Sequence, residues 1–265
     1  MKNKRYGFTL IEVAIFLVIT GALFAAVTVG VQNSIYHQRQ NDAVQNLLEY
    51  LRGIYSQVTN VESEGGGDSK YAIYGKLLTF GQSTDLAGEA NDKNALFSYN
   101  VVGKIEETDS SNLLQSLALL DANVVRQDPS DSRYRALGLA ESYVPRWATA
   151  IQNVDNYDLF KGALLIVRHP RSGTVYTYAM EGETIEVNAT IKDTNMGSEI
   201  IAGANPLLPF LNDEHFSIKQ VDLCLNMDGN ESGGPRFDIR ILKNARNASG
   251  VETTSDDDNK CRIGS

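Results

Sequence analysis

The run from Val13 to Val31, VAIFLVITGALFAAVTVGV, constrains this chain more than any other feature because it contains no charged residue. As an α-helix rising about 1.5 Å per residue, the run extends roughly 30 Å, the thickness of the hydrocarbon core of a bilayer. The preceding segment carries Lys2, Lys4 and Arg5, and a basic flank of this kind keeps a leading end in the cytoplasm. The sequence therefore predicts a membrane span with its N-terminus inside and the rest of the chain exported.

Glu12 directly precedes the uncharged run and does not suit a simple anchor. An ionisable group inside an apolar span costs roughly 3 kcal/mol on insertion scales, so its presence there indicates a function and a partner. The alternative is that Glu12 lies at the end of the helix and its carboxylate reaches the headgroups. Position alone leaves both interpretations open.

The basic leader MKNKRYG, the segment Gly-Phe-Thr-Leu-Ile-Glu at residues 7–12 and the uncharged span together resemble the class III signal of type IV prepilins and pseudopilins. This resemblance implies that a membrane aspartate peptidase cuts between Gly7 and Phe8, and that Phe8 is then N-methylated. It also implies that Glu12 acts in filament assembly. A buried charge is tolerated only when it is paired, so we expect Glu12 to pair with the α-amine of Phe8, in its own chain or a neighbouring one.

The resemblance further implies a structural, non-enzymatic role as a subunit of a type IV pilus-like or type II secretion pseudopilus-like filament. Its expected partners are other pilin subunits, the prepilin peptidase, the inner-membrane assembly machinery and, before assembly, membrane lipid. The precursor is expected in the cytoplasmic membrane and the mature chain in an extracellular or periplasmic filament. A minor pilin or pseudopilin fits the large head better than a bulk subunit does. The competing hypothesis is an adhesin or DNA-binding receptor carried on a pilin stem.

Beyond the span the pattern becomes amphipathic, with apolar residues at spacings of three and one. We expect a single helix over residues 8–62, of which residues 8–31 span the membrane and residues 1–7 form the cleaved leader. A separate anchor and helix would need a break near Asn33, where neither proline nor paired glycine occurs. The apolar stripe of the second half consists of Val44, Leu47, Leu48, Leu51, Ile54, Tyr55 and Val58.

Residues 63–265 are expected to form a globular α+β head, an antiparallel sheet packed against the amphipathic half of the helix as in the pilin fold. A short helix is expected from about residue 111 to 124, and the region 106–157 is expected to be an insertion because the head is larger than one sheet requires. Branched and aromatic content predicts strands at 71–80, 96–102, 145–151, 163–168, 175–180, 218–227 and 236–242.

The net charge and the two cysteines indicate which partners to expect and whether a disulfide forms. The net charge is −9, and loss of the three basic residues of the leader makes it −12. A body this acidic disfavours nucleic acid as a partner, although Arg236, Arg240, Lys243 and Arg246 form a basic cluster. The two cysteines, Cys224 and Cys261, both lie on the exported side, where an even count predicts one disulfide.

No motif for catalysis or for a cofactor is readable. The histidines His37, His169 and His215 are dispersed, and none has metal-ligand spacing to another histidine or a cysteine. The segment Asp228–Gly233 copies the first half of a calcium loop, but Ile239 stands where the closing glutamate should be. A polar hairpin turn is the better interpretation of that segment. We therefore expect neither an enzyme nor a cofactor.

Overall fold

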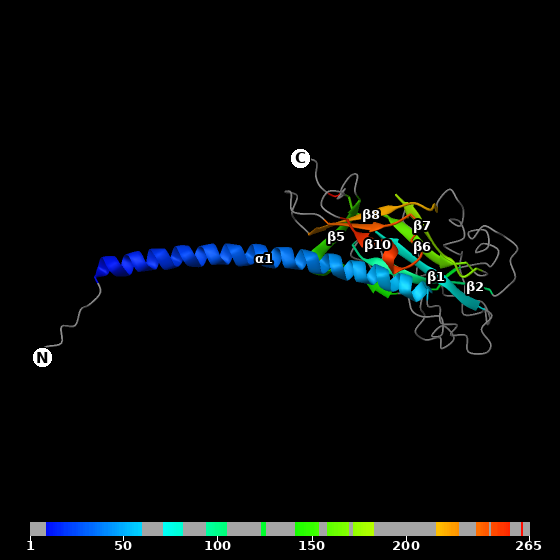
Figure 1. Ribbon diagram of the computed structural model, residues 1–265, viewed down its shortest axis with the longest axis horizontal. Helices are drawn as coiled ribbons and strands as arrows, with labels where there is room; N and C mark the ends of the chain where they lie inside the picture. The colour runs from blue at the N-terminus through cyan, green and yellow to red at the C-terminus, as the bar shows by residue number, and fades with distance from the viewer. Residues whose placement is uncertain are drawn as a thin grey trace, which may run out of the picture. The chain divides into compact units, whose positions relative to one another are not determined.

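The computed structural model describes residues 9–59, 71–81, 94–104, 123–125, 141–153, 158–169, 172–182, 216–227, 237–243, 245–254 and 261. The chain divides into two compact units, Met1–Asp42 and Ala43–Ser265. Helix α1, Leu10–Thr59, contributes to both and is drawn in blue to cyan (Figure 1). The helix continues through Asn33, so the expected single helix is confirmed over this range.

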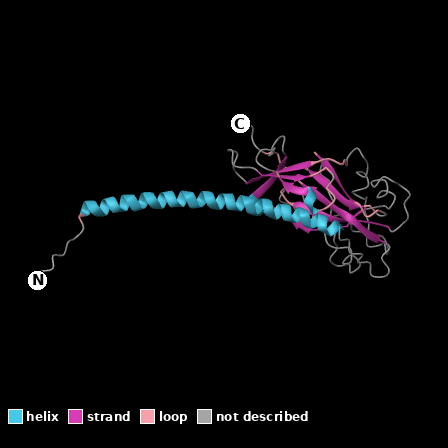
Figure 2. Ribbon diagram, viewed as in Figure 1, coloured by secondary structure: helices cyan, strands magenta, loops and turns pink. Residues whose placement is uncertain are grey.

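Ten strands are described in the second unit, and they form two antiparallel sheets (Figure 2). The first sheet has the order β3-β2-β1-β6-β7, with β4 also paired to β2. Its strands are β1 (Tyr71–Phe80), β2 (Leu96–Lys104), β3 (Asn123–Val125), β4 (Glu141–Tyr143), β6 (Gly162–Arg168) and β7 (Val175–Glu181).

The second sheet has the order β10-β9-β8-β5. Two 3-10 turns, η2 (Arg146–Ala148) and η4 (Ala248–Gly250), directly precede β5 and β10. Because β4 pairs in the first sheet and β5 in the second, η2 marks the place where the chain passes from one sheet to the other. The strands are β5 (Thr149–Asn153), β8 (Val221–Met227), β9 (Phe237–Ile241) and β10 (Val251–Thr253).

One hydrophobic core joins the amphipathic part of α1 to both sheets. All seven residues of the stripe predicted from sequence are buried, with at most 4 % of each exposed. They pack with alternate residues of β1 and β6 from the first sheet and of β8 and β9 from the second. The opposite face of the first sheet belongs to a second buried cluster that includes Phe97, Tyr99 and Phe216. The head is therefore a pilin-like α+β fold in which the helix packs against antiparallel sheets.

A hydrogen-bonded chain crosses the first of these cores. The hydroxyl groups of Tyr55 on α1 and Thr177 on β7 lie 2.7 Å apart, and the Thr177 hydroxyl donates to the carbonyl of Ala245 at 2.9 Å. Burial raises the pKa of the Tyr55 phenol, which therefore stays neutral. Hydrogen bonding satisfies these polar groups inside the core and ties the helix to β7 and to the segment after β9.

The close approach of β1 to β6 explains why a glycine, Gly75, occurs in the first sheet. A β-bulge between Ile73 and Gly75 interrupts the β1–β2 register, and a Cβ at Gly75 would collide with the carbonyl of Ile166 and with Val167 on β6. Near the same end of β6, Gly173 has φ +70° in the turn before β7, a conformation that glycine adopts at little cost. This turn joins β6 to β7, which pair as neighbouring antiparallel strands.

Two expectations for the head are wrong. A single sheet was expected, and the described strands form two. The helix expected to end near Val124 is replaced there by β3, whose Val124 pairs with Val101 of β2, while the earlier part of that helix lies outside the described residues. The span 106–157 supplies β3, β4 and β5 to the two sheets. Whether that span is an insertion stays a prediction, as does the boundary of the head at residue 63.

Candidate functional site

Helix α1 begins in a reciprocal hydrogen-bonded cap between Thr9 and Glu12. The Thr9 backbone N–H and hydroxyl both donate to Oε2 of Glu12, at 2.9 and 3.0 Å. In return the Glu12 N–H donates to the Thr9 hydroxyl at 3.3 Å. This arrangement is a capping box, in which a threonine and a glutamate three residues later satisfy N–H groups that the helix itself leaves unpaired. The carboxylate also lies in the first turn, where the helix dipole favours negative charge.

The cap was not predicted, although the spacing Thr9-x-x-Glu12 was present as its signal. The sequence interpretation gave Glu12 one partner, the α-amine of Phe8. Gly7 and Phe8 lie outside the described residues, so that pairing, the cleavage point and the methylation stay predictions. What the structure adds is a second set of donors for the same carboxylate, supplied by Thr9.

The helix surface that follows the cap is apolar and exposed. Leucine, isoleucine, valine and phenylalanine side chains on every side of α1 from Leu10 to Val31 are exposed, and Leu10, Val18 and Phe24 are more than 70 % accessible. This part of α1 is long and apolar enough to cross a membrane, and the other described residues bury none of it. A helix that is hydrophobic all round needs lipid or other helices to cover it.

The threonine hydroxyls within this apolar surface donate hydrogen bonds to backbone carbonyls of the same helix. The Thr20 hydroxyl donates to the carbonyl of Phe16 at 2.8 Å, and the Thr28 hydroxyl donates to that of Phe24 at the same distance. Such bonds to the preceding turn leave no hydroxyl donor that would need water. Gly21 and Gly30 have no atom near the position of a Cβ, so each leaves a shallow gap on the helix surface. Small residues of this kind let helices approach closely in an apolar medium.

The C-terminal part of the head is held by the predicted disulfide. Cys224 on β8 is bonded to Cys261, the two Cα atoms lie 5.5 Å apart, and both side chains are fully buried. The bond closes a sequence separation of 37 residues. It therefore ties Cys261 covalently to β8, one of the two central strands of the second sheet.

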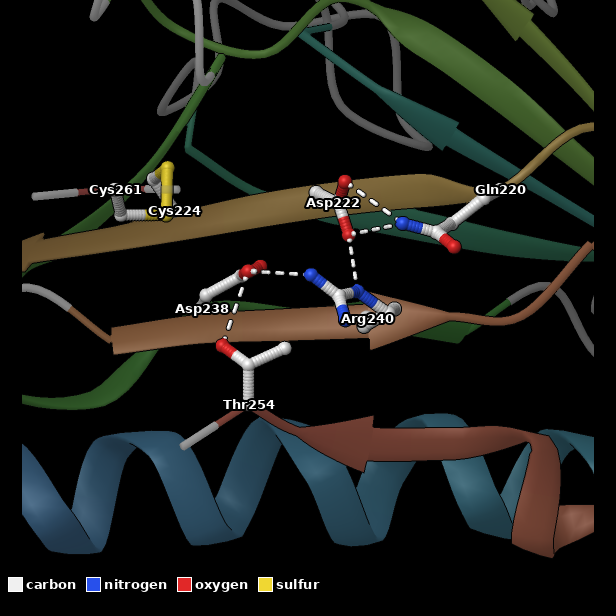
Figure 3. Close-up of polar contacts among 7 residues, drawn as sticks. All are labelled: Gln220, Asp222, Cys224, Asp238, Arg240, Thr254 and Cys261. Carbon is white, nitrogen blue, oxygen red and sulfur yellow. Dashed lines mark hydrogen bonds and ion pairs between the residues drawn. A yellow bond between two sulfur atoms is a disulfide. The ribbon is translucent and has the colours of Figure 1, made fainter. Parts of the chain in front are cut away.

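Beside the disulfide lies a network of charged residues on the same face of the second sheet (Figure 3). Nε of Arg240 donates to Oδ1 of Asp222 at 2.8 Å, and its NH2 group lies 3.7 Å from Oδ2 of Asp238. The Thr254 hydroxyl donates to the same Asp238 oxygen at 3.1 Å. Asp238 is only 1 % exposed, so Arg240 balances a buried negative charge.

This network changes the interpretation of the predicted basic cluster. Arg240 is committed to the two aspartates and does not offer a free positive charge. Arg236 lies outside the described residues. Lys243 and Arg246 remain exposed, on the segment that connects β9 to β10. The expected cluster of four cations is thus reduced, among the described residues, to this pair.

The described residues hold no group of three histidine, cysteine, aspartate or glutamate side chains able to bind a metal ion. Neither His37 nor His169 belongs to such a group among the described residues, and His215 is not among them. The segment Asp228–Gly233 also falls outside them, so its assignment as a polar turn rather than a calcium loop stays a prediction.

Comparison with known proteins identifies the N-terminal segment. Residues 2–28 match the family model described as the prokaryotic N-terminal methylation motif. This motif is the class III signal typical of type IV pilins and pseudopilins, and the matched range contains the cap at Thr9 and most of the exposed apolar surface. No curated protein and no solved structure matches the chain.

Proposed function

We propose that this chain is made as a membrane prepilin, cut between Gly7 and Phe8 and N-methylated at Phe8. The mature chain then assembles through α1 into a type IV pilus-like or type II secretion pseudopilus-like filament. One observation carries the proposal: the methylation motif includes most of an uncharged helical surface, Val13 to Val31, that no described residue of the unit Met1–Asp42 covers.

The physical argument concerns what covers that surface at each stage. Burying apolar area contributes about 25 cal/mol per Å², so the side chains of Val13 to Val31 strongly favour a non-aqueous environment. Lipid supplies this environment while the precursor is stored in the cytoplasmic membrane. A bundle of like helices supplies it after extraction, when the chain has left the bilayer. The same helix therefore serves as the membrane anchor and as the filament core.

The remaining parts of the chain follow from this role. Residues 1–7 are the leader that the prepilin peptidase removes, residues 8–62 form the stem, and residues 63–265 form a head on the exported side. The disulfide between Cys224 and Cys261 suits an oxidising compartment outside the cytoplasm. A head of roughly 200 residues, above the usual size of a single small domain, supports a minor pilin or pseudopilin rather than the bulk subunit.

Imaging tests the role directly. Filaments sheared from cells are labelled with antibody to the head and viewed by electron microscopy. Label on filaments supports assembly, and its distribution separates the roles, since tip-only label indicates a minor subunit and continuous label a bulk one. A head that stays entirely in the membrane fraction of cells that make filaments contradicts the proposal.

A further inference from the structure

A small cavity on the head is lined by the two cations that the second sheet leaves exposed. The more exposed of its lining residues, Lys243, Arg246, Tyr176 and Ile218, form its rim. Its floor consists of side chains that are at most 5 % exposed, namely Val175, Thr177 and Ala245. The cavity thus lies where the segment after β9 packs against β7.

The floor of this cavity is held rigidly. The Thr177 hydroxyl donates to the Ala245 carbonyl at 2.9 Å and lies 2.7 Å from the Tyr55 hydroxyl of α1. The Ala245 N–H donates to the carbonyl of Leu242 at 2.9 Å, which fixes the turn that carries Lys243. Binding at a site whose backbone is already ordered loses little conformational entropy.

The two cations are not neutralised within the described part of the chain. No hydrogen bond or ion pair joins Lys243 or Arg246 to another described residue, whereas the nearby Lys219 is paired with Glu181 at 3.0 Å and Arg240 with Asp222 at 2.8 Å. Although the chain has a net charge of −9, no acidic side chain is among the described residues that line this cavity with Lys243 and Arg246. Their field favours a negatively charged group in the cavity between them.

The size of the cavity limits what that group is. Its volume of about 40 Å³ corresponds to roughly three water positions, which is too small for a base or a sugar ring. A single tetrahedral oxyanion fits this space. The guanidinium of Arg246 offers paired N–H donors and the ammonium of Lys243 a compact charge, a combination suited to phosphate oxygens.

We infer that this cavity is a binding site for one phosphate group, held between Lys243 and Arg246. The rim formed by Tyr176 and Ile218 gives a phosphate carried on a larger molecule an apolar surface to contact, because Ile218 is 37 % exposed beside the cavity. The site lies on the head and does not depend on cleavage of the leader or on assembly of the stem. It adds a ligand-binding property to a structural subunit.

The test uses the full chain in an uncharged detergent, with the isoleucine methyl groups labelled for NMR. Inorganic phosphate is titrated in at low ionic strength, because exposed charges are screened by salt. The expected result is a saturable shift of the Ile218 methyl signal. The double variant Lys243→Gln/Arg246→Gln should bind at least about tenfold more weakly, since two charge-assisted contacts are lost.

A charge-matched control distinguishes a specific phosphate site from non-specific attraction of phosphate to exposed cations. Lys161→Gln/Arg146→Gln removes two exposed cations that do not line the cavity and should leave phosphate affinity within about twofold, a difference of under 0.5 kcal/mol. Titration with glycerol phosphate distinguishes two possible sources of the bound phosphate group. Tighter binding than that of inorganic phosphate indicates a phosphate ester that reaches Ile218. Equal binding indicates free phosphate. A shift that does not saturate, or an equal loss of affinity in both double variants, would overturn the inference.

Discussion

The carboxylate of Glu12 accepts two hydrogen bonds from Thr9, one from its backbone N–H at 2.9 Å and one from its hydroxyl at 3.0 Å. The carboxylate therefore already has partners within its own chain. We propose two roles for the same group: a cap that begins α1, and a negative charge that pairs with the α-amine of Phe8 during assembly. A substitution that removes the charge of this group but keeps a hydrogen-bond acceptor distinguishes the two roles.

Glu12→Leu and Glu12→Gln should both be inserted and cleaved normally, accumulate in the membrane and enter filaments poorly. Each leaves the Phe8 amine without a counter-charge in an apolar bundle, a loss of roughly 3 to 5 kcal/mol for a broken buried pair. The measurement is the share of each cleaved variant in sheared filaments relative to the membrane pool. Glutamine retains an acceptor for Thr9, so normal incorporation of Glu12→Gln alone would assign the capping role and contradict the charge pair.

A buried lysine of the first sheet should make the stability of the head depend on pH. Lys76 on β1 is 8 % exposed, and desolvation lowers the pKa of its ammonium group, with the Glu141 carboxylate acting in the opposite direction. Between the lowered folded pKa and the ordinary value near 10.4, the unfolded chain binds more protons. Stability of the head should therefore rise with pH across that window and be lowest below it.

Lys76→Met should raise the free energy of unfolding at pH 7 by about 1 kcal/mol, because it removes a buried cation at nearly constant side-chain length. The gain should shrink as the pH approaches 10, where the native lysine is increasingly neutral. Urea titrations of the full chain in detergent micelles at pH 7 and pH 10 measure both quantities. A constant difference between the two proteins at the two pH values would show that the lysine does not titrate within this window.

The helix was predictable because its signals are local. The uncharged run, the stripe from Val44 to Val58 and the lack of a breaker near Asn33 all lie within one element, and the structure has one helix there. The disulfide was predictable from cysteine count and compartment alone. In each case the information needed to choose the structure lies in neighbouring residues or in composition.

The division into two sheets was not predictable, since strand pairing depends on residues far apart in sequence. β10 has only three residues, which pair with β9, and the Arg52 guanidinium of α1 donates to the carbonyl of Val251 at 2.9 Å. A strand of three residues is too short to show the alternation of apolar and polar side chains by which strands are predicted. At Val124, pairing with Val101 of β2 overrides a local leucine pattern typical of a helix. The phosphate cavity likewise brings together β7 and the segment after β9.

The disulfide between Cys224 and Cys261 should stabilise the head by up to about 4 kcal/mol, the chain-entropy value for a loop of this length. Cys261→Ser should therefore lower the melting temperature and expose the residues after Asn247 to proteolysis. A Cys224→Ser/Cys261→Ser double variant should melt at a similar temperature and be unaffected by reductant. Two titratable thiols in the native exported protein would show that the bond does not form.

Arg240→Leu should destabilise the head by roughly 3 to 5 kcal/mol, because it leaves the buried Asp238 carboxylate without a counter-charge. Adding Asp238→Asn should recover part of this loss, since the neutral amide still accepts from the Thr254 hydroxyl. A thermodynamic cycle of the two single variants and the double variant gives the coupling free energy. Additive effects would mean that Arg240 stabilises the head through Asp222 alone.

The central claim, that this chain is processed as a prepilin and assembled through α1, is tested most directly at the N-terminus of the protein found in filaments. Sheared filaments are digested and the N-terminal peptide is identified by mass spectrometry, with Gly7→Val as the processing-defective control. We predict a peptide that begins at N-methylated Phe8 in the wild type and a full-length chain, still carrying MKNKRYG and confined to the membrane, in Gly7→Val. A filament-borne chain that begins at Met1, or a methylated Phe8 terminus in Gly7→Val, would contradict the account.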